Sequence, residues 1–114
     1  MITLYGIKSC DTMKKAMTWL DNEGVDYTFH NYKKDGLPED LLEQWLTSPG
    51  WETLINRRGT TWRKLDQDVR DNIDEASARA IMLDNPSIIK RPLLDIDGER
   101  TVGFSPEEYA ARFK

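Results

Sequence analysis

The spacing of apolar residues changes several times along the chain, and each change marks a predicted element. Residues 2–5, ITLY, are rich in β-forming types and predict a short buried strand. Apolar residues then recur every three or four positions up to Gly24, which predicts an amphipathic helix with Ser9 as its cap. Residues 25–32 alternate apolar and polar side chains and predict a strand with one buried face. Strand, helix and strand in succession predict a βαβ unit.

The middle of the chain has a helical period. One helix is expected to begin at Pro38, a second pattern runs from Trp62 to Ile73, and a third covers residues 74–84. Trp45 and Trp62 are expected in the core of this block. No stretch rich in glycine or serine interrupts it, so residues 38–85 predict a helical insertion rather than a linker.

The last part of the chain returns to β structure. PLLDI and RTVGF flank the dipeptide Asp97-Gly98, which predicts an antiparallel hairpin with a type I′ turn. SPEE follows, and it predicts a final helix with Ser105 as cap and Glu108 completing a capping box. The order β-α-β, helical insertion, β-β-α predicts an α/β fold with a mixed four-stranded sheet. A single domain spanning residues 1–114 is expected.

Composition narrows the class of protein. The 114 residues carry a net charge of −4, which argues against direct binding to nucleic acid through its phosphates. One cysteine and one histidine can form neither an internal disulfide nor an ordinary zinc site, so no metal is expected. The sequence shows no secretion leader and no long apolar run. We therefore expect a cytoplasmic protein that does not enter a membrane.

Cys10 stands where the first predicted strand gives way to a helix. Backbone N–H groups at a helix start lack intrahelical partners, and together with the helix dipole they lower the pKa of a thiol. Lys8 adds positive charge nearby. The alternative is that Cys10 packs as a small hydrophobe. Its polar neighbours Lys8 and Asp11 favour the reactive interpretation.

Two basic segments are further candidates. KRP, residues 90–92, precedes the returning strand, and Arg91 is either a solvated charge or a guanidinium that binds a carboxylate or another oxyanion. Spacing alone favours a trans bond at Pro92, with a cis bond as the alternative. INRRGTTWRK contains Arg57, Arg58 and Arg63, and a charge run of this kind is most often a solvated surface.

These segments together carry a resemblance to a known family. With Cys10 after the first strand, INRRGTTWRKL in the middle and IKRPLL before the hairpin, the chain resembles the ArsC-like family, which has a thioredoxin-like fold. LYGIKSCDTMKKA, NRRGTTWRKL, KRPLLDIDG and VGFSPEEY are similar to the YffB branch, bacterial proteins regarded as glutathione-dependent thiol reductases. The resemblance implies that Cys10 is the redox cysteine and that Arg91 precedes a cis-proline. It also implies that Arg58 is a basic site residue, with Arg57 and Asn56 as alternatives.

Two positions depart from the family pattern, and they change which substrate and which redox mechanism are expected. Arsenate reductases of the family carry a further anion-binding arginine near the end of the second hairpin strand, where this chain has Gly103 and Phe104. Arsenate is therefore not expected as the natural substrate. Spx-like regulators, which bind RNA polymerase, have a second cysteine three positions after the first, where this chain has Met13. A CxxC redox switch is thus impossible here.

The resemblance leads to a functional prediction. The chain is expected to be a glutathione-dependent thiol/disulfide reductase that acts on a small thiol, a disulfide or another oxidised substrate, with glutathione as co-substrate. The expected catalytic residues are Cys10 and Arg91, and the expected glutathione-binding residues are Lys8, Asn56, Arg58 and Pro92. One alternative is an Spx-like regulator that binds RNA polymerase, which is the less favoured partner. Another is a folded scaffold with an inert cysteine.

Overall fold

The computed structural model describes residues 1–8 and 10–113, so the predicted cap Ser9 lies outside the described residues. Two compact units make up the chain. The first combines Met1–Asp35 with Arg91–Lys114, and the second is Gly36–Lys90. The predicted helical insertion, 38–85, falls within the second unit, while the assignment of a single domain stays a prediction.

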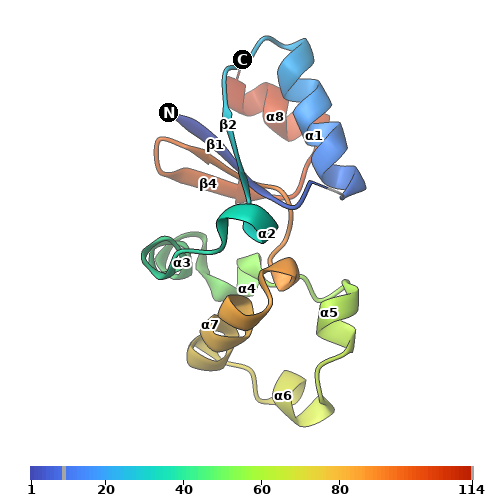
Figure 1. The fold of residues 1–114 in the computed structure, drawn as a ribbon, viewed down its shortest axis with the longest axis vertical. Coiled ribbons are helices and arrows are strands. Elements are labelled where there is room, and N and C mark those ends of the chain that lie inside the picture. Colours follow the sequence, from blue (N-terminus) through green and yellow to red (C-terminus); the bar gives the residue numbers. More distant parts are fainter. Residues whose placement is uncertain (9, 114) are drawn as a thin grey trace. The chain divides into compact units, whose positions relative to one another are not determined.

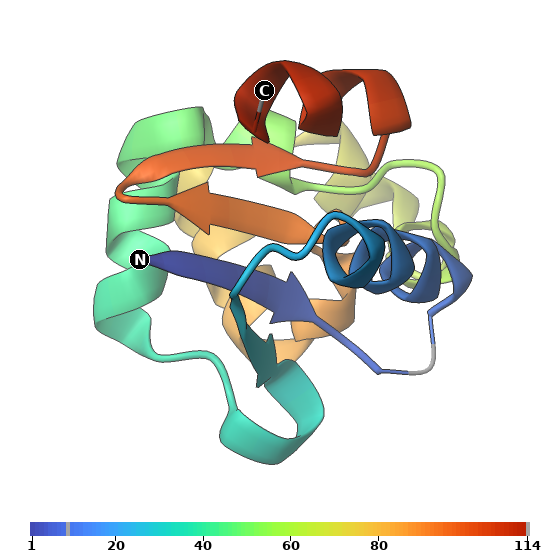
Figure 2. The ribbon, with the colours of Figure 1, turned by 90° about the horizontal axis from the view of Figure 1, so that it is seen from above.

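The first unit is built on a four-stranded sheet with the order β2-β1-β3-β4, whose strands lie side by side in Figure 2. The strands are β1 (Ile2–Gly6), β2 (Thr28–Asn31), β3 (Leu93–Ile96) and β4 (Glu99–Val102). β1 pairs with β2 in parallel and with β3 antiparallel, and β3 pairs antiparallel with β4. The predicted mixed sheet is therefore confirmed, although β2 begins at Thr28, later than the alternating pattern suggested.

Two helices, α1 (Asp11–Asn22) and α8 (Pro106–Phe113), lie beside each other against the sheet (Figure 1). A third, α2 (Tyr32–Asp35), directly follows β2. The buried side chains of the core come from both helices and the two central strands: Leu4, Met13, Ala16, Leu20, Leu94 and Tyr109. Burial of this apolar face, rather than helix propensity, holds a helix as short as α1 in place. The same packing fixes the start of α1, and with it Cys10.

The hairpin and the last helix follow the sequence signals closely. Asp97 and Gly98 both have positive φ, 52° and 94°, as a type I′ turn requires, so the predicted turn is confirmed. The Ser105 hydroxyl accepts the Glu108 N–H at 3.4 Å, which confirms Ser105 as the cap. Its own proton goes to the Glu107 carboxylate at 2.8 Å. This contact with Glu107 was not part of the predicted capping box, and the role of the Glu108 side chain in that box stays a prediction.

The second unit contains only helical elements and loops. They are α3 (Glu39–Trp45), a π-helical segment (Leu46–Gly50), α4 (Trp51–Leu54), α5 (Thr60–Arg63), α6 (Gln67–Asp71), α7 (Glu75–Asp84) and a 3₁₀ turn (Pro86–Ile88). Trp45 is fully buried, as expected. An isolated antiparallel β-bridge pairs Ile55 with Ile89, so the residues just before and just after the segment 56–88 lie next to each other.

The predicted helix from Trp62 to Ile73 is wrong. Asp66 has extended backbone angles, φ −59° and ψ 146°, and its carbonyl accepts the N–H groups of Val69 and Arg70 as a new helix begins. This break turns α5 and α6 in different directions. Val69 is consequently 38% exposed, and Trp62 is only partly buried rather than a core residue.

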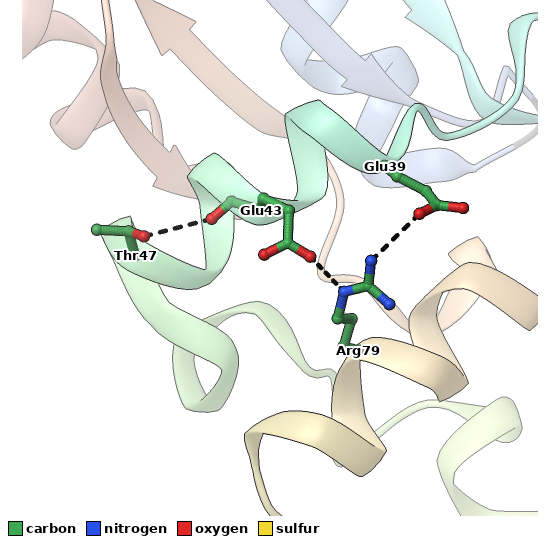
Figure 3. A network of polar contacts seen from close by, with 4 residues as sticks. All are labelled: Glu39, Glu43, Thr47 and Arg79. Atoms are coloured by element: carbon green, nitrogen blue, oxygen red, sulfur yellow. Dashed lines mark hydrogen bonds and ion pairs between the residues drawn. The ribbon is translucent and has the colours of Figure 1, made fainter.

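Helices α3 and α7 of the second unit are joined by polar contacts, shown in Figure 3. Arg79 donates from Nη2 to Glu39 at 3.2 Å and from Nε to Glu43, while the Thr47 hydroxyl donates to the Glu43 carbonyl at 3.3 Å. Both carboxylates are more than half exposed, so these ion pairs contribute little to stability.

Within residues 1–8 and 10–113, no helix is both long and apolar enough to cross a membrane. Over the same residues, no three His, Cys, Asp or Glu side chains gather where they could hold a metal ion.

Candidate active site

Cys10 occupies the N-cap of α1. Its backbone is extended, with φ −85° and ψ 131°, and its carbonyl accepts the Lys14 N–H at 3.1 Å as the first bond of the helix. The Cys10 N–H donates back to the Ile7 carbonyl at 3.3 Å, which closes the turn between β1 and α1. The side chain is half-buried and packs against the edge of the core described above. The thiol therefore stands at the positive end of the helix while one side of it remains accessible.

Several influences act on the pKa of the Cys10 thiol. Partial burial is the largest, and it raises the pKa because it disfavours the charged form. The N–H groups of Met13 and Thr12 and then the hydrogen bond and charge of Arg91 act in the opposite direction. Together they outweigh burial and hold the pKa below the ordinary value of a thiol. Cys10 thus carries more thiolate, the nucleophilic form, than an unperturbed cysteine at the same pH.

Arg91 and Pro92 come from the segment that enters β3. The Arg91-Pro92 bond is cis, so the trans bond favoured by spacing is wrong and the cis-proline implied by the family resemblance is confirmed. Pro92 is buried, and its carbonyl accepts the Gly103 N–H at 2.9 Å from the loop after β4. Because β1 and β3 run antiparallel with Tyr5 opposite Leu93, the end of β1 and the start of β3 meet at one end of the sheet. That register places Arg91 beside Cys10.

Arg91 also lies close to Tyr32, which is 4% exposed. Burial, followed by the nearby Tyr5, raises the pKa of Tyr32, and the Arg91 charge acts against them. The guanidinium thus influences both the Cys10 thiol and a buried phenol. Lys8 is exposed, and its predicted role at the thiol stays a prediction.

Asn56 and Arg58 belong to the second unit, where they line a pocket of about 400 Å³. Its lining residues are Glu52, Ile55, Asn56, Arg57, Arg58 and Lys90. Three cationic side chains face one carboxylate in this set, so the pocket has the charge to hold an anion. Arg57 also lies over the Trp62 ring, with its guanidinium carbon 5.4 Å from the ring centroid.

The NRRG turn shapes this pocket. The Asn56 N–H donates to the Ile88 carbonyl at 2.8 Å, and the Asn56 side-chain oxygen accepts the Arg58 N–H at 3.1 Å. A Cβ at Gly59 would lie 2.9 Å from the Asn56 amide nitrogen, so a larger residue there would disturb the turn. Asn56 therefore orders the turn, and the arginines beside it supply the positive charge.

Comparison with known proteins shows to which family the chain belongs. The model of the ArsC family matches residues 5–112. The chain belongs to the ArsC family. Its resemblance to this family, predicted from Cys10, the NRRG segment and the KRP segment, is confirmed, and so is the thioredoxin-like fold.

Several known proteins are similar to this chain over most of its length. An uncharacterized protein of Haemophilus influenzae is 45% identical over 113 residues, which are 99% of each chain. The global transcriptional regulator Spx of Staphylococcus epidermidis is 32% identical over 95% of this chain and 83% of its own. A solved structure described as the YFFB (PA3664) protein is 51% identical with a TM-score of 0.93 and covers 100% of both chains. An arsenate reductase (ArsC) related protein from Brucella melitensis is 57% identical with a TM-score of 0.83, covering 99% of this chain and 94% of its own.

The sequence reasoning missed two features. It placed the thiol at a helix start but did not identify the N–H groups of Thr12 and Met13 as those that act on it. It also quoted KRP without assigning a role to Lys90, which lines the pocket of the second unit. The bridge between Ile55 and Ile89 explains this placement, and a contact between segments so far apart in sequence leaves no local signal.

Proposed function

We propose that this chain is a thiol oxidoreductase that uses Cys10 as its single nucleophile and glutathione as its co-substrate. The observation that carries the proposal is the setting of Cys10: two backbone N–H groups and Arg91 converge on a half-buried thiol and lower its pKa. Membership of the ArsC family, with an arsenate reductase related protein among its similar structures, supports redox chemistry in general. Because a free thiolate persists best where disulfides are kept reduced, we place this activity in the cytoplasm.

The proposed reaction proceeds through two disulfide exchanges. The Cys10 thiolate attacks the glutathione sulfur of a mixed disulfide between glutathione and a substrate thiol, a new S–S bond forms, and the substrate leaves as a thiolate. A second glutathione, as its thiolate, then attacks the glutathione sulfur bound to Cys10. Glutathione disulfide is released and the Cys10 thiolate is restored. Overall, one mixed disulfide of substrate and glutathione reacts with one glutathione thiol to give the substrate thiol and glutathione disulfide, and the proton of that glutathione thiol goes to the substrate thiolate.

External resolution is required because the chain contains one cysteine. An intramolecular exchange would need a second thiol, and Met13 occupies the position where a CxxC motif would supply it. Arg91 suits the reaction in two ways: its charge favours the attacking thiolate, and its planar guanidinium can hold a carboxylate of glutathione. Contributions of Lys8, Asn56, Arg58 and Pro92 to glutathione binding are part of the same proposal.

Intact-mass analysis tests this function. The wild-type protein and Cys10→Ser would be incubated with oxidised glutathione between about pH 5 and pH 9. One glutathione adduct should form on the wild-type protein near neutral pH, be absent from the serine variant and disappear with reduced glutathione. An adduct that forms only after addition of denaturant would show that the thiol is inaccessible in the folded protein, and the proposal would be abandoned.

A second candidate function comes from the similarity to Spx. The identity of 32% over 95% of the chain raises the possibility of a regulator that binds RNA polymerase. A pull-down with the polymerase α subunit distinguishes the two, because the oxidoreductase proposal expects no retention. Retention of both wild type and Cys10→Ser, without glutathione exchange, would favour the regulator.

A further inference from the structure

A shallow groove of about 360 Å³ lies along α1 in the first unit. It is lined by Lys14, Lys15, Thr18, Trp19, Asn22 and Phe104, and its walls are mostly apolar. Two lysines belong to this described lining and no carboxylate does, although the chain as a whole has a net charge of −4. The residues that line the groove therefore combine apolar surface with positive charge, although α1 also carries Asp11 and Asp21 outside this lining.

The aromatic side chains of the groove are held in place from beneath. Trp19 meets the Tyr109 ring edge-to-face with centroids 5.6 Å apart, and Phe104 meets the same ring at 4.8 Å. Tyr109 is 1% exposed and belongs to the core, so it supports both side chains on a rigid base. Trp19 also packs against Phe113 at 5.8 Å. An apolar surface fixed in this way costs little ordering entropy when a partner covers it.

The groove begins close to the reactive thiol. Lys14 follows Cys10 by one helical turn, and its N–H donates to the Cys10 carbonyl. At about 1.5 Å per residue, the lining residues of α1 lie roughly 6 to 18 Å along the helix from Cys10. Phe104 is also linked to the surroundings of Cys10. The N–H of the adjacent Gly103 donates to the carbonyl of Pro92, which directly follows Arg91. A chain with its sulfur at Cys10 would reach the groove within about two to five extended residues.

We propose that this groove docks a segment of a protein substrate that has an apolar residue and carboxylates within five residues of its reactive cysteine. The inference rests on the proposed function, and it names the substrate class: glutathionylated proteins with acidic, apolar flanks rather than small disulfides. The apolar residue covers Trp19 and Phe104, and the carboxylates lie beside Lys14 and Lys15. Complementary charge of this kind acts mainly on association and on the choice of partner.

The test compares three substrates in the same exchange assay. The first is a synthetic peptide with a glutathionylated cysteine and two aspartates and a leucine on each side of it. The second carries lysines in place of the aspartates, and the third is the uncharged small molecule bis(2-hydroxyethyl) disulfide. The wild-type protein should favour the acidic peptide, and salt at about 0.5 M should reduce that preference because exposed charges are screened.

Lys15→Glu reverses one charge of the groove. The rate ratio of acidic peptide to small disulfide should fall roughly three- to tenfold, and the lysine peptide should gain in rate. Lys15→Arg keeps the charge and should keep the ratio. Lys34→Glu, an exposed position on α2, makes the same change in net charge outside the groove and should also keep the ratio. A change in the reactivity of the Cys10 thiol would alter the exchange rates of the acidic peptide and of the small disulfide by the same factor. The ratio of these two rates therefore reports on docking alone.

Direct binding decides the inference even if exchange fails. Fluorescence anisotropy with a labelled acidic peptide, its cysteine replaced by serine, should show binding that weakens in Lys15→Glu and on replacement of the peptide leucine by serine. Exchange without any difference between the peptides, together with equal anisotropy for both, would overturn the docking site and leave the proposed function standing. Binding without exchange would support the docking site and count against the proposed function.

Discussion

Gly6, the last residue of β1, makes a close contact with the helix that carries Cys10. A Cβ built at Gly6 would lie 2.3 Å from the sulfur and 2.7 Å from the terminal carbon of Met13. Both distances are far below van der Waals contact, and Met13 is fully buried in the core of the first unit. We therefore expect Gly6→Ala to destabilise the protein, even though alanine is normally the better residue in a strand.

The expected magnitude follows from two opposing effects. Alanine lowers the entropy of the unfolded chain, which alone would stabilise the protein by about 0.4–1 kcal/mol. Overpacking a full core costs about 1–3 kcal/mol, because the buried Met13 side chain cannot move without displacing its neighbours. The net effect is a destabilisation of roughly 1–2 kcal/mol. Met13→Ala should cost about 2–5 kcal/mol, since it leaves a cavity in the same place.

The two substitutions should be strongly coupled. In the Met13→Ala background the space beside Gly6 is open, so Gly6→Ala should become neutral or stabilising by up to about 1 kcal/mol. Urea unfolding followed by tryptophan fluorescence measures all four variants of the cycle, since the chain has four tryptophans. If Gly6→Ala has no cost in the wild type, or the same cost in both backgrounds, the contact does not determine the choice of glycine and the reasoning is refuted.

Three further predictions concern titratable groups. Arg91→Gln should raise the pKa of Cys10, because the lost charge and the lost hydrogen bond both favour the thiolate. The rate of iodoacetamide alkylation should therefore rise at higher pH in the variant than in the wild type, and identical pH profiles would contradict this. The pKa of Cys10 is lower in the folded protein than in the unfolded chain. Ionisation of Cys10 therefore stabilises the folded protein fully at pH values above the unfolded pKa of ~8.5, and this contribution to the free energy of unfolding is lost as the pH falls through the folded pKa. The stability difference between wild type and Cys10→Ala should therefore grow with rising pH in urea titrations, and a constant difference would argue against it. Burial raises the pKa of all four tyrosines, so ultraviolet absorbance should show no tyrosinate transition at or below about pH 10 before unfolding; a transition there would refute the burial.

Local signals predicted most elements of the first unit. The Asp97-Gly98 turn and the Ser105 cap depend on hydrogen bonds and backbone angles within a few residues, so the sequence carries them directly. The pattern failed between Trp62 and Ile73, where apolar spacing continued across Asp66. The competing signal was also present, since Asp66 is a good N-cap residue, but periodicity alone cannot decide between one long helix and two short ones.

The sequence by itself determined where the Cys10 thiol would stand: Cys10 lies at the start of a helix because the strand before it and the amphipathic pattern after it are both local properties. Only the tertiary structure decided what surrounds that thiol. The antiparallel pairing of Tyr5 with Leu93 brings Arg91 to Cys10, and the Gly103 to Pro92 hydrogen bond brings Phe104 to the same region. Such contacts join segments far apart in the chain and depend on sheet register, which is set by burial of one whole face rather than by any short stretch of residues.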